Sequence, residues 1–240
     1  ELDHDCATAA LPAYARWLAA ARPPAPLRWS ITALPTWAGS PALADVAAAV
    51  DELVVQVHAV RAPTIFDRAG ARRGLDAFAA AVPAAHRRVA LPTYAVVLDG
   101  RRVAADPADV AALVRDLERR PIANLDGIVW FRLPTAGDTA AWPPATLDAV
   151  IAGAPLVARA EARLVPRGPD VYDVVVASTG SLDAPFPAIH LRGALTAADL
   201  VAGYAPAAAD AWTPPPRVLA AGTETVVGWA TGKDLRLDVP

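Results

Sequence analysis

Three residue types are scarce or missing in this sequence of 240 residues. There is no methionine, and the single cysteine, Cys6, excludes an internal disulfide and any metal cluster built from several cysteines. Lys233 is the only lysine among 22 basic residues, so arginine supplies nearly all of the positive charge. Arginine suits bidentate anion binding, but codon use in a GC-rich genome produces the same bias, and we favour that explanation.

Long apolar runs and a strong charge of one sign are missing as well. No apolar run approaches the roughly 20 residues of a transmembrane helix, so we expect no membrane span in this segment. The formal net charge is −3, and no block of Lys or Arg alternates with aromatic residues, so we expect no nucleic-acid partner. A hydrophobic fraction of 55% with 20% charged residues is typical of a folded globular protein.

The first 150 or so residues alternate between short strand-like runs and alanine-rich helical stretches. This pattern is typical of parallel βα units. We predict helices at 9–21, 41–50, 71–82, 107–119 and 144–152, with Ser40 and Asp106 as N-caps. The predicted strands are 1–5, 28–34, 52–58, 88–91 and 127–133. The tripeptide Leu-Pro-Thr follows three of these strands, at Leu34, Leu91 and Leu133, where proline ends the pairing.

Five βα units fit two architectures, an open doubly wound sheet or part of a (β/α)8 barrel, which has eight strands. Because the sequence begins abruptly on a strand and without an initiator methionine, we favour a TIM-type barrel truncated to its last five units, over residues 1–153. Residues 154–240 change to an antiparallel pattern, which predicts an all-β accessory domain resembling a small β-sandwich. Its predicted strands are 157–164, 171–176, 188–192, 217–221 and 225–230, with 205–216 as a long connection.

Polar and aromatic residues gather where the predicted parallel strands end, which is where the active site of such a sheet lies. Strand residues two apart share a face, so Asp3 lies with Asp5, Gln56 with His58, and Trp130 with Arg132. On the last strand, this alternation puts Phe131 on the opposite, apolar face. Tyr94 and Trp37 follow two Leu-Pro-Thr copies. The candidate site is therefore Asp3, Asp5, Trp37, Gln56, His58, Tyr94, Trp130 and Arg132.

Two carboxylates beside aromatic rings suit the hydrolysis of a glycosidic bond, in which one acid protonates the leaving oxygen and the rings stack on sugars. Three other interpretations remain open. Asp3, Asp5 and Arg132 could form a structural ion-pair cluster, with Arg132 fixing Asp5 rather than a substrate acid. His58 could be a core histidine. Asp3, Asp5 and His58 could hold a divalent ion, although we expect neither a metal nor another cofactor.

Several of these segments together resemble a bacterial family of unknown function, domain of unknown function 3142. The resemblance covers residues 1–150 and extends loosely into the β domain. That family is described as having a glycoside-hydrolase-like TIM barrel, so the resemblance implies a fold more than an activity. The matching segments are Glu1-Leu-Asp-His-Asp-Cys, Ser30-Ile-Thr-Ala-Leu-Pro-Thr-Trp, Val55-Gln-Val-His, Ala90-Leu-Pro-Thr-Tyr and Val129-Trp-Phe-Arg-Leu-Pro.

A more distant likeness is to chitinase-like barrels. Those barrels carry Asp-x-Asp-x-Glu on one strand and a tryptophan beneath the sugar at the end of another. Glu1, Asp3 and Asp5 are similar to the acidic motif, and Trp130 is similar to the tryptophan. This chain departs from the pattern in the final, acid position, where Asp5 is one methylene shorter than glutamate.

These observations lead to one main hypothesis and two alternatives. We expect an exported carbohydrate-active protein (periplasmic, lipid-anchored or extracellular) whose signal region lies outside this chain. It would hydrolyse a cell-wall or extracellular polysaccharide, with Asp5 as general acid and Asp3 stabilising positive charge. Gln56, His58 and Tyr94 would bind hydroxyls. The alternatives are a non-catalytic polysaccharide-binding barrel and a metal-dependent hydrolase that uses Asp3, Asp5 and His58.

Overall fold

A computed structural model describes residues 1–58, 64–135 and 137–238. The chain divides into two compact units, Glu1–Trp142 and Pro143–Pro240. No helix within the described ranges is both long enough and apolar enough to cross a membrane.

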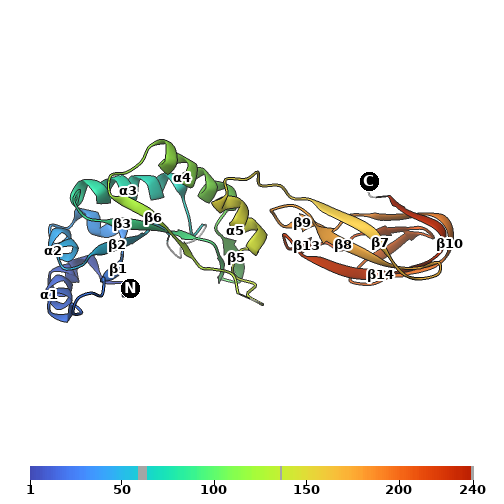
Figure 1. Cartoon of the computed structure of the whole chain (residues 1–240), viewed down its shortest axis with the longest axis horizontal. Helices are drawn as coiled ribbons and strands as arrows, with labels where there is room; N and C mark the ends of the chain where they lie inside the picture. Colours follow the sequence, from blue (N-terminus) through green and yellow to red (C-terminus); the bar gives the residue numbers. More distant parts are fainter. Residues whose placement is uncertain (59–63, 136, 239–240) are drawn as a thin grey trace. The chain divides into compact units, whose positions relative to one another are not determined.

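The N-terminal unit is built on a parallel sheet of four strands (Figure 1). The strand order follows the chain: β1 (Ser30–Ala33), β2 (Glu52–Gln56), β3 (Arg87–Pro92) and β6 (Leu125–Phe131). Leu2 extends the sheet by a single parallel bridge to Ile31. The strands are rich in valine, leucine and isoleucine, and most residues of β1, β2 and β3 are buried, as expected for parallel strands covered by helices.

The predicted TIM-type barrel is wrong. The sheet is open, with order β1-β2-β3-β6, and no closed barrel forms among the described strands. The predicted first strand, 1–5, pairs only at Leu2. The βα alternation was read correctly, but open and closed parallel sheets share that alternation. Our choice between them rested only on how the sequence begins, and that is not a structural signal.

Helices connect the parallel strands. They are α1 (Leu11–Ala21), α2 (Leu43–Ala48), α3 (Arg68–Ala81) and α4 (Pro107–Arg119), with short 3₁₀ turns at Thr8–Ala10 and Pro35–Gly39. Figure 1 shows α3 and α4 on one side of β3 and β6.

The helix caps were predicted with mixed success. Asp106 caps α4 as predicted, because its side chain accepts a hydrogen bond from the Ala108 amide. The predicted cap at Ser40 is wrong, since α2 begins at Leu43 and Ala42 occupies its N-cap.

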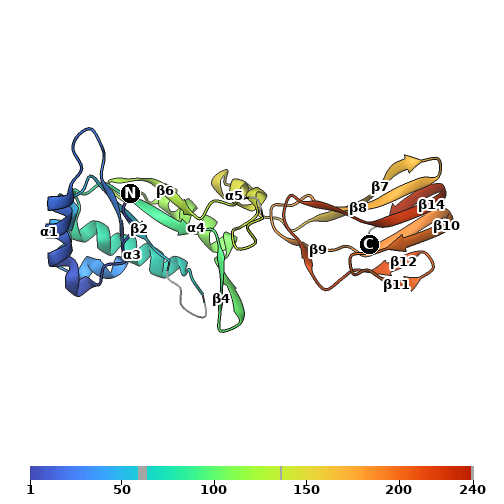
Figure 2. The same ribbon diagram turned by 90° about the horizontal axis from the view of Figure 1, so that it is seen from below.

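A hairpin that the sequence did not predict follows β3. It consists of β4 (Ala95–Leu98) and β5 (Arg101–Ala104), joined by a turn in which Asp99 and Gly100 both have positive φ. Figure 2 shows this hairpin extending from the parallel sheet. We did not predict it because Asp-Gly, a strong hairpin signal, stood between runs too short to be noticed beside the helices.

The C-terminal unit opens with α5 (Pro144–Ile151) and continues as an antiparallel sheet of six strands, in the order β11-β12-β10-β14-β8-β7 (Figure 2). Its core contains residues such as Val174, Ile189, Trp212 and Val227. The strands are β7 (Ala160–Gly168), β8 (Val171–Ser178), β10 (Ile189–Leu200), β11 (Ala205–Ala208), β12 (Ala211–Thr213) and β14 (Glu224–Asp238). A separate two-stranded ribbon pairs β9 (Ala184–Pro185) with β13 (Val218–Leu219).

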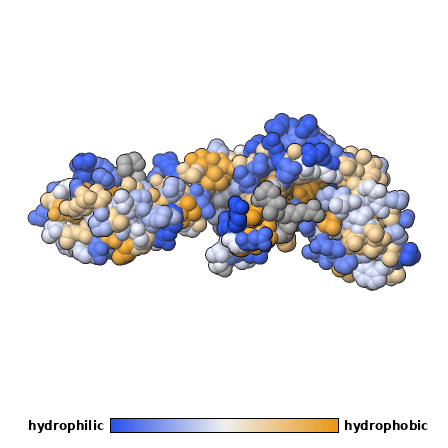
Figure 3. All heavy atoms as spheres, turned by 180° about the vertical axis from the view of Figure 1, so that it is seen from behind, coloured by the Kyte–Doolittle hydropathy of each residue, from blue (hydrophilic) through white to orange (hydrophobic). Residues whose placement is uncertain are grey.

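The antiparallel texture of this unit was predicted correctly, but its layout was not. The pairing gives one large sheet and a small ribbon rather than two sheets of similar size. The predicted connection 205–216 instead contains the hairpin of β11 and β12. Its many prolines and alanines argued against a strand. Because β11 is an edge strand, however, Pro206 is tolerated there. On the face shown in Figure 3, hydrophilic and hydrophobic residues are interspersed over most of this unit.

Candidate functional site

The candidate site lies at the carboxyl ends of the parallel strands, where β2, β3 and β6 each lead into a predicted site residue. Gln56 is the last residue of β2, and His58 follows it by two residues. Tyr94 lies two residues after β3, and Trp130 is the penultimate residue of β6. Because parallel strands end at the same edge of a sheet, these residues come from neighbouring positions of one edge.

His58 is the most distinctive side chain at this edge. It is only 6% exposed, and its Nδ1 atom has no hydrogen-bond partner within the described residues. Burial lowers the pKa of His58, while a backbone hydrogen bond with Ala90 and the charges of Asp3 and Asp5 partly oppose that shift. The imidazole is therefore held neutral, with a buried nitrogen available for a ligand.

The charges of Asp3 and Asp5 both act against the lowering of the His58 pKa. Both acids are exposed, and neither forms an ion pair with any residue that the structure describes. The structure therefore leaves both carboxylates accessible, and their membership of one site with His58 stays a prediction.

Aromatic rings surround His58. Its ring centroid lies 5.6 Å from that of Tyr94 in an edge-to-face arrangement and 5.7 Å from that of Phe131 in a stacked one. Tyr94 and Phe131 also meet edge to face at 5.6 Å. Such pairs each contribute about 0.5–1.5 kcal/mol beyond area burial. The rings of Tyr94 and Phe131 therefore hold the imidazole in one orientation.

Phe131 is the residue that sequence reasoning missed. Strand alternation assigned Trp130 to the site and Phe131 to the opposite face, but Phe131 packs on His58 and is 46% exposed. Trp130 is partly exposed and makes no ring contact with His58 or Tyr94 among the described residues. The sequence held no signal for this. The alternation rule applies within a strand, and Phe131 is the last residue of β6.

Arg132 does not pair with Asp5, the partner that one of the open interpretations gave it. Its guanidinium bonds Asp138 at 2.5 Å. Asp138 also accepts hydrogen bonds from the backbone amides of Ala140 and Ala141. The hydrogen bond from Arg132 is the main cause that lowers the pKa of Asp138, and the two amides add to it. The pair fixes the loop after β6, which borders an open cavity of about 500 Å³. No ionic cluster of Asp3, Asp5 and Arg132 exists in the part of the chain that the structure describes.

Trp37 must be withdrawn as a sugar-stacking residue. It is fully buried, and its indole Nε1 donates a hydrogen bond to the Cys6 carbonyl oxygen at 2.9 Å. Gln56 stays at the edge, where its side-chain amide donates to the His58 carbonyl oxygen at 3.3 Å. Trp37 therefore belongs to the core, whereas Gln56 positions the segment that carries His58.

A metal centre finds no support at this edge. Across residues 1–58, 64–135 and 137–238, no three His, Cys, Asp or Glu side chains are grouped closely enough to hold an ion.

Comparisons with known proteins identify one relationship. No curated protein and no solved structure matches the chain. A family model does match residues 1–103, the portion that contains α1, β1, β2, β3 and the residues Asp3, Asp5 and His58. The family's description names no activity, so the likeness to glycoside hydrolases gains nothing from this match. Residues 1–103 of this chain thus match the family described as Domain of unknown function (DUF3142).

Proposed function

We propose that this chain is a carbohydrate-active protein that binds a cell-wall or extracellular polysaccharide, after export, at the carboxyl ends of β2, β3 and β6. We further propose that it hydrolyses a glycosidic bond there. The proposal is carried by two features together: the exposed, unpaired carboxylates of Asp3 and Asp5, whose charges act on His58, and the buried, unpartnered Nδ1 of His58 at the strand ends. Buried polar atoms normally have partners, so a ligand hydroxyl is a natural partner for this one.

The chemistry of a sugar matches what this edge offers. A pyranose presents several hydroxyls, which carboxylates, an amide and an imidazole can bind, and an apolar face of C–H groups. The 46% exposed ring of Phe131 offers an apolar surface beside His58 for that face. Trp130, which is partly exposed in the preceding position of β6, offers a second ring.

The proposed roles follow from these positions. Asp5 protonates the glycosidic oxygen as it leaves, and Asp3 stabilises the positive charge that develops on the sugar ring. His58 and Gln56 bind hydroxyls, while Tyr94 holds the His58 ring in place through their edge-to-face contact at 5.6 Å. Arg132, already paired with Asp138, shapes the loop beside the site.

A non-catalytic carbohydrate-binding protein is the second candidate, and the exposure of both carboxylates favours it. A general acid works best where water is excluded, and neither Asp3 nor Asp5 is covered by the described residues. This candidate keeps the same ligand and the same residues but assigns Asp5 to binding rather than proton transfer.

The two candidates separate in one experiment on the 240-residue chain. Turnover of a panel of polysaccharides is followed by the release of reducing ends, and binding by depletion onto the insoluble polymers. Asp5→Asn should lower turnover by about 10²–10⁴-fold, the contribution of a general acid, and leave binding within about threefold. The matched control is Asp99→Asn, in the turn between β4 and β5, where positive φ suits asparagine.

The possible outcomes are distinct. Turnover that Asp5→Asn removes supports hydrolysis. Saturable binding without turnover, weakened by Phe131→Ala but not by Asp99→Asn, supports the binding protein. If no polysaccharide is bound or cleaved, both candidates fail.

A further inference from the structure

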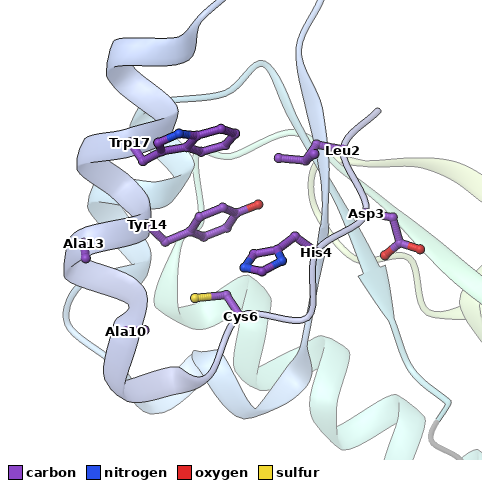
Figure 4. Close-up of a pocket in the computed structure, with 8 residues that line it drawn as sticks. All are labelled: Leu2, Asp3, His4, Cys6, Ala10, Ala13, Tyr14 and Trp17. Atoms are coloured by element: carbon purple, nitrogen blue, oxygen red, sulfur yellow. The ribbon is translucent and has the colours of Figure 1, made fainter.

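A second cavity lies between the N-terminal segment and helix α1, and it has a different chemistry from the candidate site. Its volume is about 520 Å³ (Figure 4). The rings of Tyr14 and Trp17 form one wall, stacked with centroids 6.1 Å apart and planes within 9°. The aliphatic and small side chains of Leu2, Ala10 and Ala13 form much of the remainder. Trp17 is 50% exposed, so its ring is open to an incoming molecule.

The helix explains why these rings face the cavity. Tyr14 and Trp17 are three residues apart in α1, and helical residues at that spacing lie on neighbouring positions of one face. The two leucines of the helix, Leu11 and Leu18, are completely buried. Helix α1 thus buries one part of its apolar surface and leaves the Tyr14–Trp17 pair at the cavity.

The Tyr14 hydroxyl indicates that the cavity receives a ligand. Tyr14 is more than nine-tenths buried, and its hydroxyl has no hydrogen-bond partner among the described residues. Figure 4 shows the hydroxyl directed away from α1, toward the N-terminal segment that carries Leu2 and His4. Burial raises the pKa of Tyr14 to about 12, with smaller contributions from Cys6 and Asp3. The hydroxyl therefore remains a proton donor at any physiological pH.

The balance of polar and apolar groups decides which ligand fits. Besides Tyr14, the polar groups around the cavity are the Trp17 indole N–H, the His4 imidazole, the Cys6 thiol and Asp3, whose carboxylate points away from the rings in Figure 4. The thiol already contacts the Ala7 carbonyl oxygen at 3.5 Å. A sugar would leave most of its hydroxyls unpaired here, which is unfavourable. A flat apolar ring with one polar substituent leaves none.

We propose that this cavity binds a neutral aromatic ring bearing a single hydroxyl, with the ring against Trp17 and the hydroxyl paired with Tyr14. The ligand is neutral because the carboxylate of Asp3 borders the cavity and disfavours an anion. This site uses Tyr14 and Trp17, neither of which belongs to the proposed carbohydrate site. Either proposal can therefore fail without the other.

The probe is 4-fluorophenol, titrated onto the 240-residue chain and followed by ligand-observed ¹⁹F NMR, with fluorobenzene as the matched ligand that lacks the hydroxyl. We expect saturable binding of 4-fluorophenol that is tighter than that of fluorobenzene by about 2- to 10-fold, the value of one neutral hydrogen bond.

Two variants assign the binding to this cavity. Trp17→Ala should weaken both ligands by about 2- to 10-fold because it removes the stacking surface. Tyr14→Phe keeps the ring and should remove only the preference for 4-fluorophenol over fluorobenzene. The control is Trp229→Ala, which removes a similarly exposed tryptophan from β14 of the other unit. Circular dichroism before each titration verifies that every variant is folded.

The proposal is overturned if 4-fluorophenol does not saturate, if Trp17→Ala binds as the parent does, or if Trp229→Ala has the same effect as Trp17→Ala. If the chain binds 4-fluorophenol as expected but every carbohydrate assay fails, only the proposed carbohydrate function is wrong.

Discussion

The two units of the chain each bury a tyrosine, and the two tyrosines differ in one hydrogen bond. Tyr14 and Tyr204 are both 7% exposed, and burial raises the pKa of both to about 12. The Tyr204 hydroxyl donates to the Pro187 carbonyl oxygen at 2.8 Å. The Tyr14 hydroxyl has no partner in the part of the chain that the structure describes. Two equally buried tyrosines thus differ in their hydroxyls: the one in the C-terminal unit has a hydrogen-bond acceptor, and the one in the N-terminal unit has none among the described residues.

The contrast extends beyond the tyrosines. Four buried side-chain atoms have no hydrogen-bond partner within the described ranges, and all four are in the N-terminal unit: Tyr14 Oη, Trp29 Nε1, His58 Nδ1 and Arg87 Nε. An unpaired buried polar atom costs about 1–3 kcal/mol. Two of these atoms lie beside exposed rings: Tyr14 Oη is in the residue stacked on Trp17, and His58 Nδ1 is in the residue stacked on Phe131. Both proposals therefore rest on open hydrogen-bonding positions of the N-terminal unit.

The strongest challenge to that contrast is Arg87, a buried polar residue of the N-terminal unit whose role is structural. It is fully buried, and its guanidinium donates to the carbonyl oxygens of Val82, Ala85 and Ala123 at 2.6–3.0 Å. Arg87→Met should destabilise the N-terminal unit by about 3–5 kcal/mol, since each unpaired buried acceptor costs about 1–3 kcal/mol. The measurement is hydrogen exchange of the β2 and β3 amides in increasing urea.

Arg73→Met serves as the control for this change, because Arg73 lies on the surface of α3, 3.9 Å from Asp67. Exposed ion pairs contribute about 0–1 kcal/mol, so the control should be nearly neutral. A loss below about 1 kcal/mol for Arg87→Met would mean that the three carbonyls find other partners.

The tyrosine pair gives a smaller and sharper test. Tyr204→Phe should destabilise the C-terminal unit by about 1–2 kcal/mol because it leaves the Pro187 carbonyl without its donor. Tyr14→Phe removes a hydroxyl that has no partner and should leave stability unchanged or raise it slightly. Urea unfolding followed by amide exchange in each unit gives both numbers. Equal losses for the two variants would show that the Tyr14 hydroxyl is already satisfied.

Local patterns predicted the elements well. Helix α4 spans Pro107–Arg119, the predicted range, because Asp106 and Pro107 mark its start and its apolar residues recur at helical spacing. The parallel strands β1, β2, β3 and β6 lie at or close to their predicted positions because runs of valine, leucine and isoleucine are distinctive. What failed was the closure of the sheet, since residue types along one strand do not encode whether distant strands pair.

The candidate site was predictable in part for the same reason. Strand ends and residue types identified His58 at the sheet edge and the exposed acids Asp3 and Asp5, whose charges act on it. The contact between His58 and Phe131 joins residues 73 positions apart through three strands, and alternation assigned Phe131 to the other face. Trp37 was misread because a tryptophan after a strand looks the same in sequence whether its ring is exposed or, as here, buried and bonded to Cys6.

The smallest expected effect is on how the stability of the N-terminal unit depends on pH, through the titration of His58. Burial, the main cause, lowers its folded pKa below the ordinary value of 6.5. The unfolded chain therefore takes up a proton first as the pH falls. Stability from the neutral imidazole is present above pH 6.5 and is lost as the pH falls from there toward the lower folded pKa. His58→Gln cannot titrate, so its stability should change less than that of the parent over this window.

Two further variants make this test specific. Asp3 and Asp5 both raise the His58 pKa and so oppose its burial. Replacing both with asparagine should deepen the loss of stability at falling pH. His190→Gln, in β10 of the other unit, should leave the N-terminal curve unchanged. Parallel curves for the parent, His58→Gln and the double variant would show that His58 is hydrated in the folded chain. Its Nδ1 would then have water as a partner, and the contrast between the two units would lose its main example.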